Sequence, residues 1–124
     1  ASSEITSLHG EKRYTGVIVP ETSEKYYEII KSSETLVVVD FTASWCGPCQ
    51  KIKPVFHKFA TEYNAEFLQV DVDEFDKIAQ KAKVNAMPTF QFYANGNKVD
   101  ELVGASEEEL RQLIQKYVGK SKKS

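Results

Sequence analysis

The sequence predicts an α/β domain with a mixed central sheet of five strands and four helices, which cover both faces of the sheet. Three observations support this. Apolar, β-branched segments alternate along the chain with segments whose apolar residues recur every 3.6 residues. Segment 35–42 is apolar along its length, which is typical of a strand buried on both faces. Segment 89–103 has the turn and alternation of a β-hairpin, which adds antiparallel pairing.

The first half of the chain is predicted as an arm, a strand, a helix and a second strand. Residues 1–13 are polar without periodicity, and we expect a flexible N-terminal arm. A short strand over 14–19 ends at Pro20. A helix over 23–31 then leads into the buried strand 35–42. The connections between parallel strands should be right-handed.

The second half continues the alternation and ends in a helix. Its predicted elements are a helix over 48–63, a strand over 65–72, a helix over 75–82, strands over 89–94 and 98–103, and a helix ending near 118. The Ser106–Glu109 segment is a capping box that starts the last helix. The folded domain should therefore span 14–118, with 119–124 as a frayed basic tail.

The size and charge of the chain indicate which classes of partner it is expected to have. The 124 residues suit one domain, and a net charge of -2 gives no bulk attraction to nucleic acid or to an anionic membrane. No apolar run approaches the ~18 residues of a membrane span. We therefore expect neither partner. The N-terminus lacks the apolar core of a secretory signal, which favours a cytoplasmic protein. An organellar protein whose transit peptide has been removed is the alternative.

Both cysteines lie in the motif WCGPC, residues 45–49. Cys46 follows a buried strand, and Pro48 is typical of a first helical turn, so Cys46 should lie at a helix N-terminus with Cys49 one turn inside. Unpaired N–H groups and the helix dipole favour a thiolate at Cys46. This asymmetry predicts a two-step exchange: Cys46 attacks a substrate disulfide, and Cys49 then attacks Cys46 and releases the reduced substrate.

Two other interpretations of the cysteine pair are weaker. A structural zinc site needs four ligands, and besides the cysteines the chain offers only His9 and His57 as histidines. His57 is expected to be an exposed or half-buried helix residue, and no metal is expected. A purely structural disulfide between these cysteines would close a loop with only two residues between them, so it would add little to the stability of the fold.

Two further positions complete the candidate site. Asp40 lies in the strand predicted to be buried, where desolvation raises the pKa of a carboxyl group. It is a candidate general base for Cys49, directly or through water. A place at the sheet end, facing water, is the alternative. The Met87–Pro88 bond precedes a strand and has the chemistry to be cis, although a plain strand-start proline is the simpler interpretation.

Four segments in this order resemble the thioredoxin family: 39–49, 70–73, 86–90 and 103–105. The resemblance covers about residues 14–118. The amino-acid sequences of these segments are most similar to those of eukaryotic cytosolic members, in particular the plant h-type group. It implies the thioredoxin fold and a protein-disulfide reductase that maintains cell redox homeostasis. It implies a mostly monomeric protein without a bound cofactor, which acts on disulfide-containing clients. A thioredoxin reductase would recycle it, with electrons ultimately from NADPH or ferredoxin.

The resemblance also implies roles for residues. Cys46 becomes the nucleophile, Cys49 the resolving cysteine, and Asp40 the buried acid–base group. Pro88 becomes a cis proline. The implied client-contact surface comprises Trp45, Gly47, Pro48, Met87, Pro88, Val103, Gly104 and Ala105, where a client segment would lie extended against the Met87 backbone. Some bacterial members carry a Lys beside the buried acid, and the matching position here is Gln69.

Two rival functions use the same surface. A redox-independent binding module would need no dithiol, so the intact motif argues against that as its only role. An oxidase or isomerase would be favoured by a His between the cysteines, whereas this chain has Gly47 and Pro48, as in the reducing members.

Overall fold

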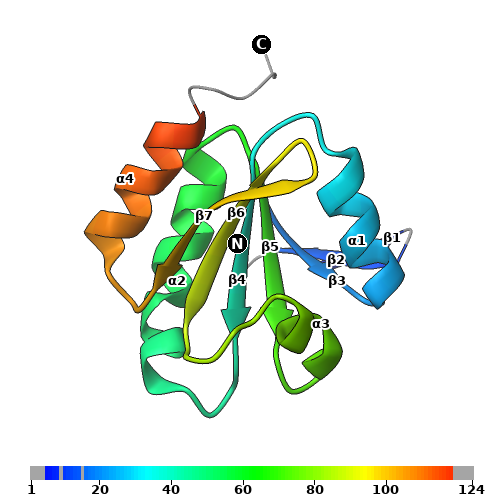
Figure 1. Cartoon of the computed structure of the whole chain (residues 1–124), viewed down its shortest axis with the longest axis horizontal. Helices are drawn as coiled ribbons and strands as arrows, with labels where there is room; N and C mark the ends of the chain where they lie inside the picture. The colour runs from blue at the N-terminus through cyan, green and yellow to red at the C-terminus, as the bar shows by residue number, and fades with distance from the viewer. Residues whose placement is uncertain (1–4, 9, 15, 119–124) are drawn as a thin grey trace.

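The computed structural model describes residues 5–8, 10–14 and 16–118, which form one seven-stranded sheet between two pairs of helices (Figure 1). The strand order is β1-β2-β3-β5-β4-β6-β7. The strands are β1 (Ile5–Leu8), β2 (Glu11–Tyr14), β3 (Val17–Pro20), β4 (Val37–Thr42), β5 (Glu66–Asp71), β6 (Thr89–Ala94) and β7 (Asn97–Val103). The helices are α1 (Ser23–Ser32), α2 (Gly47–Glu62), α3 (Asp76–Lys81) and α4 (Glu107–Val118).

The pairing of the last five strands confirms the predicted mixed sheet. Strands β3 and β4 both run parallel to β5, which lies between them. Strand β6 is antiparallel to β4, and β7 is antiparallel to β6. Helices α1 and α3 cover one face of the sheet, and α2 and α4 cover the other (Figure 1). These five strands and four helices are the predicted elements, with ends shifted by one or two residues in most of them.

The N-terminal segment differs from the prediction of an arm without regular structure. Two strands, β1 and β2, lie between residues 5 and 14, and the strand predicted over 14–19 begins at Val17 instead. Strand β2 pairs through its main chain with β1 and β3, and this extends the sheet. Because such pairing does not require alternating apolar side chains, the sequence gives little indication of these strands. The predicted tail, 119–124, lies outside the described residues, as do residues 1–4.

Side chains of β4 alternate between the two cores. Val37 and Val39 belong to the core under α1 and α3, whereas Val38 belongs to the core under α2 and α4. Successive residues of a strand point to opposite faces, so Asp40 and Thr42 share the face of Val38. The two polar positions of this buried strand therefore lie on the side where α2 begins.

The hairpin of β6 and β7 brings a distant loop to the same end of the sheet. Its tight turn uses Asn95 and Gly96, both with positive φ, as a two-residue hairpin turn requires. Beyond β7, the N–H of Gly104 donates to the carbonyl of Pro88 at 2.9 Å. Ser106 then caps α4 by accepting the Glu109 N–H at 3.2 Å, which confirms the predicted helix start.

Candidate active site

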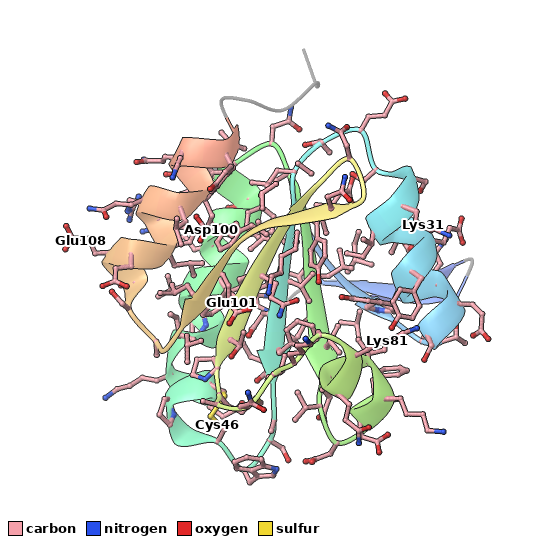
Figure 2. The ribbon with its side chains drawn as sticks, viewed as in Figure 1. Lys31, Cys46, Lys81, Asp100, Glu101 and Glu108 are labelled. Carbon is pink, nitrogen blue, oxygen red and sulfur yellow. A yellow bond between two sulfur atoms is a disulfide. The ribbon has the colours of Figure 1, made fainter. Side chains whose placement is uncertain are left out.

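The two cysteines lie at the N-terminus of α2, as predicted, and are joined as a disulfide with their Cα atoms 5.2 Å apart. Cys46 is the N-cap residue, and its Sγ accepts the backbone N–H of Cys49 at 3.2 Å. Figure 2 shows Cys46 at the end of the molecule where α2 starts. Cys46 is 6% exposed and Cys49 is fully buried, so only Cys46 offers a partner any access.

Hydrogen bonds fix the loop that carries Cys46. The carbonyl of Ala43 accepts the Cys46 N–H at 3.2 Å and the side-chain amide of Gln50 at 2.8 Å. The indole N–H of Trp45 donates to Asp73 at 2.7 Å, which holds a ring that is 67% exposed. A large aromatic side chain held in solvent beside a reactive pair is available for contact with another molecule.

Asp40 is fully buried, which excludes the alternative of a carboxylate facing water at the sheet end. Neither carboxyl oxygen has a hydrogen-bond partner among the described residues. Burial raises the pKa of Asp40 to about 7, and the positive charge of Lys53 opposes this rise in part. A carboxyl group with this pKa can both take up and release a proton near neutral pH.

The surroundings of Asp40 include a cation that the sequence argument missed. Gln69 pairs with Asp40 in the β4–β5 register, as the family comparison implied, but its Oε1 lies 3.2 Å from Nε2 of His57, which is half-buried as expected. The cation that acts on Asp40 is Lys53 of α2. It follows Cys49 by four residues, and this spacing, which places it on the helix face of Cys49, was the available signal.

The structure gathers the predicted client-contact residues around the cysteines. The Met87–Pro88 peptide bond is cis, and Met87 packs against Ala43, Cys46 and Cys49. The hydrogen bond from Gly104 ties segment 103–105 to Pro88. Gly47, Pro48 and Ala105 line one hollow of about 820 Å³. Val103 is 54% exposed, so together with Trp45 it adds apolar surface open to a partner.

The described residues form neither a metal site nor a membrane-spanning helix. Across residues 5–8, 10–14 and 16–118, no three His, Cys, Asp or Glu side chains are grouped so that they could hold a metal ion. None of the helices in this part of the chain has the length and apolar character needed to cross a membrane.

Comparison with known proteins agrees with this geometry. The family model described as Thioredoxin matches residues 17–116. Thioredoxin from Equus caballus is 49% identical over 96 residues, which cover 76% of this chain and 91% of that protein. The crystal structure of thioredoxin NaTrxh from Nicotiana alata has a TM-score of 0.79 at 37% identity, and the match covers 84% of this chain and 94% of that one.

A structure of Plasmodium falciparum thioredoxin gives a TM-score of 0.77 at 42% identity, and covers 80% of this chain and 97% of that one. The matches extend over most of this chain and of each relative. The match of the family model includes strand β4, which carries Asp40, and the start of α2, which carries the cysteines. The chain therefore belongs to the thioredoxin family, and it is a thiol–disulfide oxidoreductase whose redox-active pair is Cys46 and Cys49.

Proposed function

We propose that Cys46 is the nucleophile and Cys49 the resolving cysteine in the reduction of protein disulfides. The observation that carries this assignment is the asymmetry of the pair at the start of α2: Cys46 caps the helix and is the more accessible, whereas Cys49 is fully buried one turn inside. In the dithiol form, the N–H of Cys49 and the positive end of the helix dipole would stabilise a thiolate on Cys46.

The exchange proceeds in two balanced steps. In the first, the Cys46 thiolate attacks one sulfur of the client disulfide, the client S–S bond breaks, and the other client sulfur leaves as a thiolate. In the second, Cys49 loses its proton and its sulfur attacks Cys46. The bond between Cys46 and the client breaks, and the second client thiolate leaves. Two electrons pass to the client, and the product is the Cys46–Cys49 disulfide, the state present in the structure.

Asp40 is the group we assign to the proton of Cys49. It is buried on the face of β4 beneath α2, where neither of its oxygens is engaged by another described group. Its raised pKa of about 7 lets the carboxylate accept a proton during release and return it when the pair is reduced again. The nearby charge of Lys53 would keep part of the Asp40 population ionised at neutral pH.

We predict that Asp40→Asn slows release of the reduced client by about 10²-fold, which is the lower range for loss of a general base. Attack by Cys46 should change much less. Rapid-quench measurement of both steps on one client gives the two rates. In the wild-type protein the release rate should rise as the pH passes about 7, and in the variant the rise that is due to Asp40 should be absent. Equal release rates across pH in the two proteins would remove the acid–base role.

The same substitution should also stabilise the fold, in a pH-dependent way. The pKa of Asp40 is about 7 when folded, above its ordinary value of 3.8, so the folded state binds the proton more tightly. Stability therefore falls progressively from about pH 4 to pH 7, because the unfolded chain loses the proton that the folded state keeps, and the full loss remains above about pH 7. Asp40→Asn should gain at most on the order of 4 kcal/mol at pH 8 and almost nothing below pH 4, because tenfold in a proton affinity is about 1.4 kcal/mol.

Urea unfolding of the oxidised proteins at pH 4 and pH 8 measures this gain. The exposed Glu74→Gln substitution is a suitable control, since it also removes a carboxylate but should show no comparable difference between the two pH values. A gain for Asp40→Asn that is the same at both pH values would mean that folding does not raise the pKa of Asp40.

The client-contact surface is the second part of the proposal. Trp45, Gly47, Pro48, Met87, Pro88, Val103, Gly104 and Ala105 would contact an extended client segment, whose backbone would pair with that of Met87. Its support is the proximity of these segments to Cys46 and the exposed apolar side chains of Trp45 and Val103. Main-chain pairing is largely independent of sequence, so such a site would accept many clients.

Thioredoxins act on disulfide substrates and are reduced by thioredoxin reductases, and we propose the same cycle for this chain. It would need no bound cofactor and would work mostly as a monomer in the cytoplasm, with an organelle as the alternative. A reductase would supply electrons from NADPH or ferredoxin. Insulin reduction with NADPH and a thioredoxin reductase tests this: NADPH should be consumed only when the chain is present. A parallel assay with a ferredoxin-dependent reductase distinguishes the two electron sources.

A further inference from the structure

Two buried polar side chains of β6 bond to the stretch of chain that precedes Met87. Thr89 is 1% exposed and Gln91 is fully buried, and because they are two residues apart on one strand, their side chains lie on the same face of the sheet. The hydroxyl of Thr89 donates to the carbonyl of Ala86 at 2.6 Å. The side-chain amide of Gln91 donates to the carbonyl of Ala82 at 2.9 Å. The two bonds therefore hold both ends of the stretch that leads directly to Met87.

The residues between these two anchors have little support of their own. Residues 83–87 lie outside the helices and strands, and each of them is exposed or half-buried. Lys83 has a φ of 62°, a left-handed conformation that is unfavourable for a residue with a side chain. The N–H groups of Lys83 and Val84 bond back to carbonyls of α3 and so support the start of this stretch. The bonds from β6 are therefore well placed to fix the Met87 backbone relative to Cys46.

The orientation of the Gln91 amide is set by its other bonds. Its Oε1 accepts the hydroxyl of Tyr93 at 2.6 Å, and its Nε2 donates a second bond to Glu101 at 3.1 Å. Glu101 in turn lies 2.8 Å from the ammonium group of Lys98. An amide rotated by half a turn would set its oxygen against the oxygens of Ala82 and Glu101, which cannot donate to it. Gln91 is therefore a rigid anchor within the sheet.

Met87 is the point at which this arrangement meets the reaction. It packs against Ala43, Cys46 and Cys49, and its backbone is the proposed pairing edge for an extended client. An edge that becomes ordered only on binding loses part of the binding free energy to that ordering. Holding the edge in place should therefore favour clients that lie along it, whereas small disulfides, which reach only Cys46, should gain little.

We propose that Thr89 and Gln91 are positioning residues for client recognition. Their bonds to Ala86 and Ala82 hold the Met87 backbone in the geometry that pairs with a client peptide, and so set a preference for peptide disulfides over small ones. Both side chains are buried, so they act on the client only through Met87. The substrate class that this implies is a disulfide within an extended, accessible main-chain segment. This inference rests on the proposed pairing of a client with Met87.

Thr89→Val, which keeps the size of the side chain and removes its hydroxyl, is the primary test. The rate constants for attack by Cys46 are measured on a peptide disulfide and on hydroxyethyl disulfide. We expect the ratio of the first to the second to fall about tenfold in Thr89→Val and in Gln91→Met, the effect of one hydrogen bond at the upper end of the usual range. Thr89→Ser keeps the hydroxyl and should restore the ratio. In insulin reduction, the loss should be a rise in KM with little change in kcat.

Thr35→Val is the matched control. Thr35 is 8% exposed, and its hydroxyl donates to the carbonyl of Asn64 at 3.1 Å, so this variant also removes a buried hydroxyl that is bonded to a main-chain carbonyl. Thr35 precedes β4 and the cysteines follow it, so the substitution lies at the opposite end of that strand. It should leave the ratio unchanged. A fall in the ratio as large as that of Thr89→Val would indicate general loosening of the fold and would overturn the inference.

A modified client separates this inference from the proposal beneath it. N-methylation of the peptide at the residues that flank its cysteine removes main-chain donors and obstructs pairing with Met87. It should slow attack by the wild-type protein about tenfold and have much less effect in Thr89→Val, where the pairing is already weakened. If N-methylation leaves the wild-type rate unchanged, clients do not pair with Met87, and the proposed contact is wrong whatever Thr89 does.

Three results would count against the positioning role while the contact with Met87 stands. A ratio that is unchanged in both Thr89→Val and Gln91→Met would overturn it entirely. An equal fall for Thr89→Val and Thr89→Ser would indicate packing of the side chain in place of its hydrogen bond. A fall for Thr89→Val alone would remove Gln91 from the proposal. If Thr89→Val does not fold, Thr89→Ala removes the same hydroxyl, and the same comparisons apply.

Discussion

Cys46→Ser is expected to abolish disulfide reduction, lowering the rate of insulin reduction by at least about 10³-fold, to the background without the protein. A thiolate is the nucleophile in disulfide exchange, and the helix start that would stabilise it at position 46 cannot make a serine hydroxyl ionise near neutral pH. Cys49 cannot substitute, because it is fully buried beneath the loop that carries Cys46. The measurement is the insulin assay with NADPH and a reductase.

The comparison must separate lost chemistry from lost folding. The reduced wild-type protein is the matched reference, since the variant cannot form the disulfide either, and the two should unfold at similar urea concentrations. Removing a disulfide that closes only a two-residue loop should lower the stability of the fold very little, because the unfolded chain gains little entropy. A folded Cys46→Ser protein that kept a measurable rate of insulin reduction would show that Cys46 is not the nucleophile.

Cys49→Ser is expected to stop the cycle at the other step. Cys46 should still attack, but the mixed disulfide would have no neighbouring thiol to resolve it. One client should therefore stay bound to each protein molecule, with a lifetime at least about 10³-fold longer than in the wild type. Intact-mass spectrometry would detect the adduct, and dithiothreitol should remove it completely.

The trapped adducts have a second use, because they identify clients. Cys46→Ser is the control for this capture: it retains the contact surface and Cys49 but should trap nothing. If Cys49→Ser formed no adduct with a client that the wild type reduces, the two-step mechanism would be wrong.

The elements around the site could be predicted because their signals are local. The apolar run of β4, the proline of WCGPC and the capping box at Ser106 each depend on residues that are close in sequence. The two-residue hairpin turn at Asn95 and Gly96 is of the same kind. The position of both cysteines at a helix start followed from these signals alone.

The surroundings of Asp40 could not be predicted in this way. Whether a polar residue in an apolar strand is buried depends on which helix crosses it, and this is set by tertiary packing. The contribution of Lys53 has the same origin, since it depends on α2 lying over β4. The strands β1 and β2 were missed for another reason, because their support is main-chain pairing and not an apolar pattern.

The most direct test of the two-step mechanism locates the client on the wild-type protein during a single turnover. The reduced protein is mixed with one equivalent of a disulfide client, quenched at intervals with an alkylating reagent, and mapped by mass spectrometry. We predict a transient adduct in which the client is bonded to Cys46 while Cys49 carries the alkyl group, followed by conversion to the Cys46–Cys49 disulfide. A client bonded to Cys49, or formation of the disulfide with no adduct at any time, would contradict the mechanism.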